Sequence, residues 1–128
     1  MDLAGKSVLI VDDDADVRAG FSAYFEDHGA HALEVSDGTE AVRLLQAKSG
    51  AIDLVLTDIV MPEMDGIGLT IYLRKHFPSI PVVAMSGGGH IDSDDYLISA
   101  KGLGARVVLN KPILSADLDK AIASLRGP

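Results

Sequence analysis

The chain has 128 residues, no cysteine and a formal net charge of -8 at pH 7. This length suits one domain and allows a hydrophobic core to form without disulfides or structural metal. The absence of cysteine excludes a disulfide framework and a zinc–thiolate site. The excess of acidic residues argues against direct binding to nucleic acid, because phosphate contacts require clustered Lys and Arg.

The N-terminal segment contains only a short apolar run, which matches neither a signal peptide nor a membrane-spanning helix. We therefore expect one domain over residues 1–128, located in the cytoplasm and not inserted in a membrane.

Short apolar runs alternate along the chain with longer segments that have helical spacing. We expect strands at residues 8–11, 32–35, 54–57, 81–85 and 107–109. Four of these runs are almost continuously apolar, which is typical of parallel strands that are buried on both faces. The second run is mixed and suits an edge strand.

The intervening segments predict helices at residues 16–28, 38–47, 66–76, 93–103 and 115–125. Gly29 and Gly104 are expected to end the first and fourth helices, and Pro78 follows the end of the third. Ser115 is the expected N-cap of the last helix. Five strands that alternate with helices predict an α/β domain with a doubly wound, five-stranded parallel sheet and helices on both faces.

Chemically active residues follow four of the predicted strands. The strand ends carry Asp12-Asp13-Asp14, Asp58, Ser86 and Asn110-Lys111-Pro112. In doubly wound sheets, ligands bind at the carboxyl ends of the strands, so we expect these groups to meet at one edge.

Such an acidic cluster requires a counter-charge. Two carboxylates about 4 Å apart repel each other by roughly 4 kcal/mol at an effective dielectric constant near 20. A site made of oxygen ligands favours a hard cation, Mg²⁺ first and Mn²⁺ as an alternative. Lys111 adds a positive charge and Ser86 adds a hydroxyl, so the site suits the oxygens of a phosphoryl group, with Asp58 as nucleophile.

The sequence VLIVDDD, followed by DLVLTDIVMPEMDG, VVAMSGG and VLNKP, resembles the response regulator receiver family, the CheY-like domains of bacterial two-component signalling. The motifs occur in order over nearly the whole chain, each at a predicted strand end. The resemblance implies a flavodoxin-like sheet with strand order 2-1-3-4-5.

The resemblance also implies a role for each matching residue. Asp58 is the expected phosphoacceptor, with Ser86 as the switch hydroxyl and Lys111 as the phosphate-pairing lysine. The expected metal ligands are Asp13, Asp58 and the backbone carbonyl of Val60, with Asp12 holding the metal through water. A cis peptide bond is expected before Pro112.

Three features depart from the family pattern. Val108 stands where an aromatic switch residue is usual, Ile113 stands where Phe is frequent, and Gly87-Gly88-Gly89 follow Ser86. Val108 has no ring to reorient, so we expect activation to order the loop at residues 86–92 and to shift the helix that begins near Ser93.

The resulting hypothesis is a phosphotransfer signalling domain, not a turnover enzyme. A histidine kinase or histidine phosphotransfer protein is the expected phosphoryl donor, and an unknown downstream protein is the expected target. The main alternative is a Mg²⁺-dependent phosphatase of the haloacid-dehalogenase type, with Asp12 as nucleophile and Asp14 as general acid. A receiver-like module that is never phosphorylated is a third possibility. Asp14 and Asp16 are otherwise expected to be acids at a helix N-terminus.

Overall fold

The computed structural model describes residues 1–48, 50–59, 66–86 and 104–125. Its central feature is one sheet of five parallel strands in the order β2-β1-β3-β4-β5, which confirms the expected topology. The strands are β1 (Ser7–Val11), β2 (His31–Val35), β3 (Leu54–Asp58), β4 (Val82–Ser86) and β5 (Val107–Asn110).

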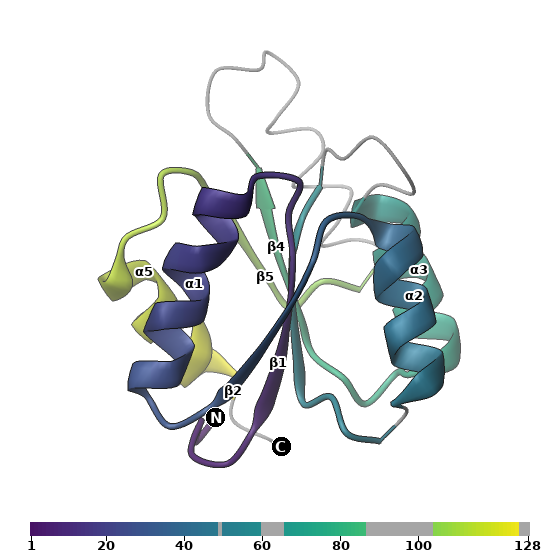
Figure 1. The fold of residues 1–128 in the computed structure, drawn as a ribbon, viewed down its shortest axis with the longest axis horizontal. Coiled ribbons are helices and arrows are strands. Elements are labelled where there is room, and N and C mark those ends of the chain that lie inside the picture. The colour runs from purple at the N-terminus through teal and green to yellow at the C-terminus, as the bar shows by residue number, and fades with distance from the viewer. Residues whose placement is uncertain (49, 60–65, 87–103, 126–128) are drawn as a thin grey trace.

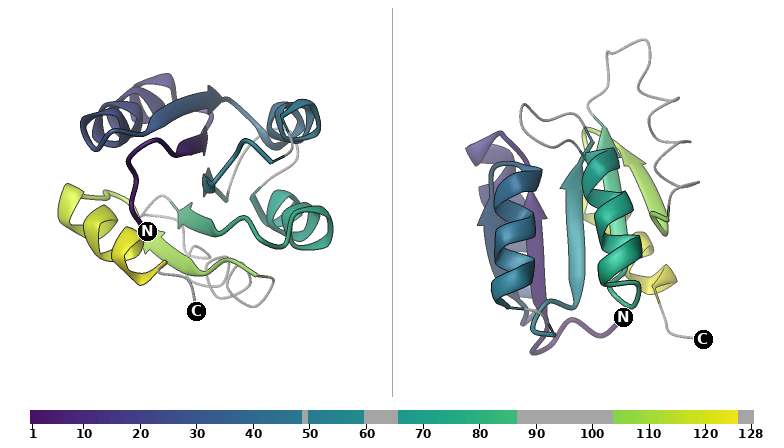
Figure 2. Two further views of the ribbon diagram at one scale, coloured as in Figure 1. Left: turned by 90° about the horizontal axis from the view of Figure 1, so that it is seen from below. Right: turned by 90° about the vertical axis from the view of Figure 1, so that its right-hand side faces the viewer.

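Helices cover both faces of the sheet. Helices α1 (Ala15–Asp27) and α5 (Ser115–Ser124) pack on one face, and α2 (Gly38–Ala47) and α3 (Gly66–His76) pack on the other (Figure 1). Figure 2 shows the same three layers from below and from the side. The helix predicted at residues 93–103 lies outside the described residues.

The core has two parts because successive side chains of a strand point to opposite faces. Val8 and Ile10 of β1 pack on the α1/α5 face with Phe25, while Leu9 and Val11 pack on the α2/α3 face. All five residues of β3 are buried, as expected for the central strand. By contrast, β2 is partly exposed at the edge, as its mixed sequence predicts.

Strand β5 departs from the expectation of burial on both faces. It is the other edge of the sheet, and its apolar residues are half-buried. Its apolar composition alone does not reveal this position.

Two helix starts also differ from the sequence prediction. Helix α1 begins at Ala15, one residue earlier than expected, because the Asp14 carboxylate accepts hydrogen bonds from the backbone N–H groups of Asp16 and Val17. Ser115 is not the N-cap of α5 but its first residue. The N-cap is Leu114, whose backbone N–H donates to the Asp117 carboxylate at 2.8 Å.

The stop signal at Gly29 is confirmed. The φ angle of Gly29 is 84°, in the left-handed region that favours glycine, and its N–H donates to the carbonyl of Glu26 just past the end of α1. None of the described helices is long and apolar enough to cross a membrane.

Candidate functional site

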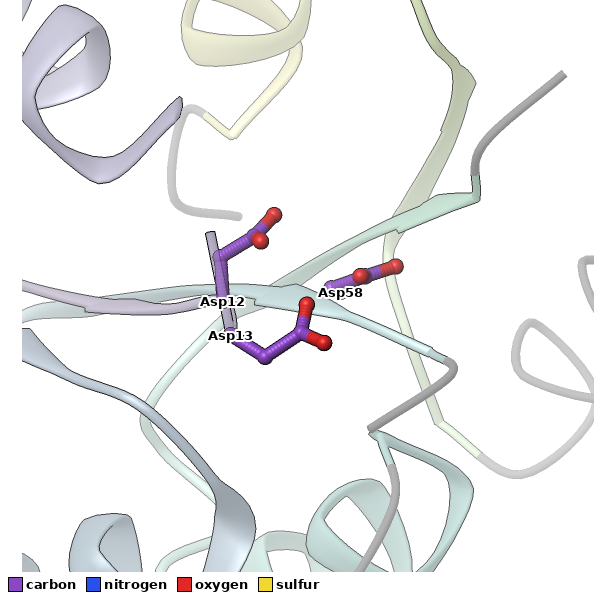
Figure 3. Close-up of side chains that lie close together, drawn as sticks. All are labelled: Asp12, Asp13 and Asp58. Carbon is purple, nitrogen blue, oxygen red and sulfur yellow. The ribbon is translucent and has the colours of Figure 1, made fainter. Parts of the chain in front are cut away.

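Three carboxylates converge at the carboxyl ends of β1 and β3. One ligand oxygen from each of Asp12, Asp13 and Asp58 lies within 4.8 Å of the others (Figure 3). Asp12 is fully buried and Asp58 is 6% exposed, whereas Asp13 is exposed. The site therefore has a buried wall of two carboxylates and a third carboxylate open to solvent.

The register of the sheet brings these groups together. Val11 of β1 pairs with Thr57 of β3, so the next residues, Asp12 and Asp58, lie side by side at the carboxyl ends of the two strands. Asp58 in turn pairs with Met85 of β4. One residue further along β4 stands Ser86, beside Asn110 of β5. The predicted convergence of four strand ends at one edge is thus confirmed.

Lys111 supplies the positive charge of this edge. Its Nζ lies 2.6 Å from Asp12 Oδ2 and 3.5 Å from Asp58 Oδ2. Its backbone N–H donates to the carbonyl of Ser86 at 2.7 Å, and the Lys111–Pro112 peptide bond is cis, as the resemblance implies. Burial lowers the pKa of Lys111, but the hydrogen bond to Asp12 and the negative charges of Asp58 and Asp12 outweigh this effect, so the pKa is raised above its ordinary value.

The carboxylate of Asp14 is used by the fold. It caps helix α1 at 2.9 Å from the N–H of Asp16 and 3.3 Å from the N–H of Val17. The N–H of Asp14 donates to Asp12 Oδ1 at 2.9 Å and so closes the turn between β1 and α1. This confirms Asp14 as an acid of the helix N-terminus.

The donor set fits Mg²⁺. All three clustered side chains are carboxylates, and hard oxygen ligands suit this cation. The ammonium group of Lys111 offsets only one of the three negative charges, so a divalent cation would neutralise the remainder. Val60, whose carbonyl is an expected further ligand, lies outside the described residues.

The structure also locates the residues expected to transmit the signal. Ser86 is the last residue of β4 and is 1% exposed. Val108 is half-buried and packs on the α2/α3 face, while Ile113 packs on the α1/α5 face. The expected ordering of the loop after Ser86 and the shift of the helix near Ser93 concern segments outside the described residues.

Sequence reasoning missed one residue beside the site. Arg18 of α1 donates from a terminal guanidinium nitrogen to the carbonyl oxygen of Asp12 at 2.6 Å, and its Nε donates to Glu34 of β2 at 3.2 Å. The sequence does contain a local signal for a role of Arg18, because this arginine follows the acidic turn by about one turn of helix. No local signal identifies Glu34, because that contact depends on the pairing of β1 with β2.

The architecture and the site are those of CheY-like receiver domains. A receiver domain protein from Clostridium thermocellum superposes with a TM-score of 0.83 at 30% identity, and the match covers 92% of this chain and 91% of that one. Comparison with protein families matches residues 8–123 to the response regulator receiver domain. The chain therefore belongs to the response regulator receiver family of two-component signalling.

Longer proteins contain similar segments. The chain is 39% identical over 87 residues to the sensor kinase CckA of Brucella abortus. This match covers 67% of this chain and 9% of that protein. It is 34% identical over 107 residues to a putative response regulator, NtrX-like, of Rickettsia bellii. This second match covers 82% of this chain and 21% of the relative. The chain thus spans less than a quarter of the length of either relative.

Proposed function

We propose that this receiver domain accepts a phosphoryl group on Asp58 in a Mg²⁺-dependent reaction. The observation that carries the proposal is the position of Asp58, which lies within one cluster with Asp12 and Asp13 and 3.5 Å from the ammonium nitrogen of Lys111. This arrangement supports a role for Asp58 as nucleophile, with candidate metal ligands and an ammonium group beside it.

The proposed transfer is a displacement at phosphorus. A carboxylate oxygen of Asp58 forms a bond to the phosphorus of a phosphohistidine, the P–N bond breaks, and its electron pair returns to the imidazole. Lys111 donates to a phosphoryl oxygen and so stabilises the charge of the transferring group, while the hydroxyl of Ser86 donates to another. Asp13 and Asp58, with Asp12 through a water, would hold Mg²⁺, which would supply further charge neutralisation.

The proposed donor is a histidine kinase or a histidine phosphotransfer protein. The similar segment in a sensor kinase supports a role beside such kinases. The proposed result is a phosphorylated domain whose altered surface is read by a downstream protein. In this proposal the domain catalyses only its own phosphorylation and a slow hydrolysis, and it turns over no separate substrate.

The haloacid-dehalogenase alternative is not favoured. It requires Asp12 as nucleophile and Asp14 as general acid. The two oxygens of Asp12 accept from Lys111 and from the N–H of Asp14, and the carboxylate of Asp14 caps helix α1. A capping carboxylate points at backbone N–H groups, so it is poorly placed to donate a proton to a leaving group.

The test is labelling by a small acyl-phosphate donor with Mg²⁺. The wild type should gain one phosphoryl group that is labile to base and to hydroxylamine. Asp58→Asn should abolish the label, because an amide is not a nucleophile for this transfer. The proposal fails if Asp12→Asn removes the label and Asp58→Asn leaves it intact.

A further inference from the structure

Arg18 joins the acidic turn to the edge strand of the sheet. Its guanidinium donates to the carbonyl oxygen of Asp12 at 2.6 Å, and its Nε donates to Glu34 Oε1 at 3.2 Å. The second carboxylate oxygen of Glu34 accepts from the hydroxyl of Ser22 at 2.8 Å. The Arg18 side chain is only 17% exposed. We call this group of three residues, Arg18, Glu34 and Ser22, the arginine clamp.

The clamp acts on the peptide that connects two candidate metal ligands. The carbonyl held by Arg18 belongs to the peptide bond between Asp12 and Asp13. Asp12 is also held through its carboxylate, by the N–H of Asp14 and by Lys111. The exposed carboxylate of Asp13 has no such support from the part of the chain that the structure describes, so its orientation depends on the backbone. A hydrogen bond to this carbonyl therefore restricts the rotation of the peptide that sets the direction of Asp13.

Arginine suits this position well. Its planar guanidinium presents donors in a fixed geometry, so one side chain can serve the Asp12 carbonyl and the Glu34 carboxylate at once. Glu34 has a second effect, because its negative charge offsets the positive charge of Arg18. Without this offset, a cation beside the acidic cluster would compete with a bound metal.

We propose that Arg18, oriented by Glu34 and Ser22, is a positioning residue that holds the Asp12–Asp13 turn in the conformation that receives Mg²⁺. The inference rests on the Mg²⁺ site of the proposed function. It concerns the affinity of that site and not the chemical step, because Arg18 contacts a backbone carbonyl rather than the acceptor carboxylate.

The first experiment measures Mg²⁺ binding to Arg18→Met by calorimetry. Methionine keeps an unbranched apolar chain but cannot donate a hydrogen bond. We expect the dissociation constant to rise by about tenfold, the lower end of the effect typical of residues that orient metal ligands. Loss of a positive charge alone should tighten cation binding, so a weaker affinity separates positioning from charge. Arg43→Met removes the same charge from an exposed site on α2 and should not weaken binding.

The second readout separates affinity from reactivity. At limiting Mg²⁺, Arg18→Met should be labelled by an acyl phosphate more slowly than the wild type, and at saturating Mg²⁺ its rate should return to the wild-type value. A lower rate that persists at saturation, or a dissociation constant equal to or below that of the wild type, would overturn the proposal.

A double-mutant cycle tests whether Glu34 acts through Arg18. Glu34→Gln should weaken Mg²⁺ binding more in the wild type than in Arg18→Met, because only the wild type has the arginine that Glu34 orients. Additive effects would show that Glu34 acts independently and would overturn its part in the clamp. If Arg18→Met does not fold, Ser22→Ala carries the test, since it keeps Arg18 and changes no charge. Failure of the wild type to bind Mg²⁺ would instead contradict the proposed function.

Discussion

At the residue scale, the clustered carboxylates differ in how the protein compensates their charges. The carboxylate of Asp12 is fully buried, and both its oxygens accept hydrogen bonds, one from Lys111 at 2.6 Å. Asp58 lies further from the same ammonium group, at 3.5 Å, and Asp13 is exposed. Neutralising Asp12 therefore removes the closest ion pair of Lys111, whereas neutralising Asp13 or Asp58 keeps that pair and relieves repulsion among the carboxylates.

This difference predicts opposite effects on stability in the presence of a chelator. Asp58→Asn and Asp13→Asn should melt above the wild type, with the smaller increase for the exposed Asp13. Asp12→Asn should melt below the wild type, because Lys111 loses its closest partner. Its free energy of unfolding should be lower by roughly 1–3 kcal/mol. Differential scanning calorimetry checks these results. A lower melting temperature for both Asp13→Asn and Asp58→Asn would contradict a repulsive acidic cluster.

At the element scale, Asp14 caps the start of helix α1 and does not belong to the cluster of candidate metal ligands. Asp14→Ala removes the side chain that caps two backbone N–H groups. We expect the free energy of unfolding to fall by about 1 kcal/mol, the usual cost of losing an N-cap. Phosphoryl labelling should be retained in this variant, because the proposed chemistry does not use the carboxylate of Asp14.

The matched control is Asp16→Ala, in the first turn of the same helix. Asp16 is an exposed acid and interacts with the helix dipole, so the cost should be only a few tenths of a kcal/mol. Urea denaturation measures both variants. Loss of labelling in a folded Asp14→Ala variant would show that Asp14 has a role beyond capping helix α1.

At the scale of the whole molecule, the contact between α1 and α5 predicts an alkaline limit to stability. Tyr24 of α1 donates its hydroxyl to Asp119 of α5 at 2.6 Å. Burial, this hydrogen bond and the negative charge of Asp119 all raise the pKa of Tyr24 above its ordinary value. The unfolded chain then releases this proton at a lower pH than the folded protein. The stability that Tyr24 contributes is therefore present below about pH 10 and falls as the pH rises further.

Lys111 acts in the same direction, since its raised pKa means that the folded protein retains a proton that the unfolded chain releases. Urea denaturation in chelator between about pH 8 and 11 should show a free energy of unfolding that begins to fall as the pH approaches about 10 and falls further above it. The slope should be shallower in Tyr24→Phe, which has no phenol proton to lose, and in Asp119→Asn. An unchanged slope in Tyr24→Phe would contradict this prediction.

For the part of the chain that the structure describes, the sequence by itself determined the type and order of the elements and which residues stand at the strand ends. The short, mostly apolar run at residues 54–57 is typical of a strand that is buried on both faces, and Gly29 stops α1 because of its own backbone freedom. Parallel strands also bring their carboxyl ends to one edge, so the sequence alone is sufficient to group Asp13, Asp58, Ser86 and Lys111. These inferences succeed because each depends on local chemistry or on a general rule of sheet topology.

Only the tertiary structure decided which charges face each other. Local sequence does not show that Lys111 lies closer to Asp12 than to Asp58, nor that β5 is only half-buried. It also does not show that Arg18 reaches the Asp12 carbonyl while Glu34 of the neighbouring strand holds its other side. Such contacts join segments from separate elements, and their distances follow from strand register and helix rotation. Both are set by packing of the whole core, so no local pattern contains them.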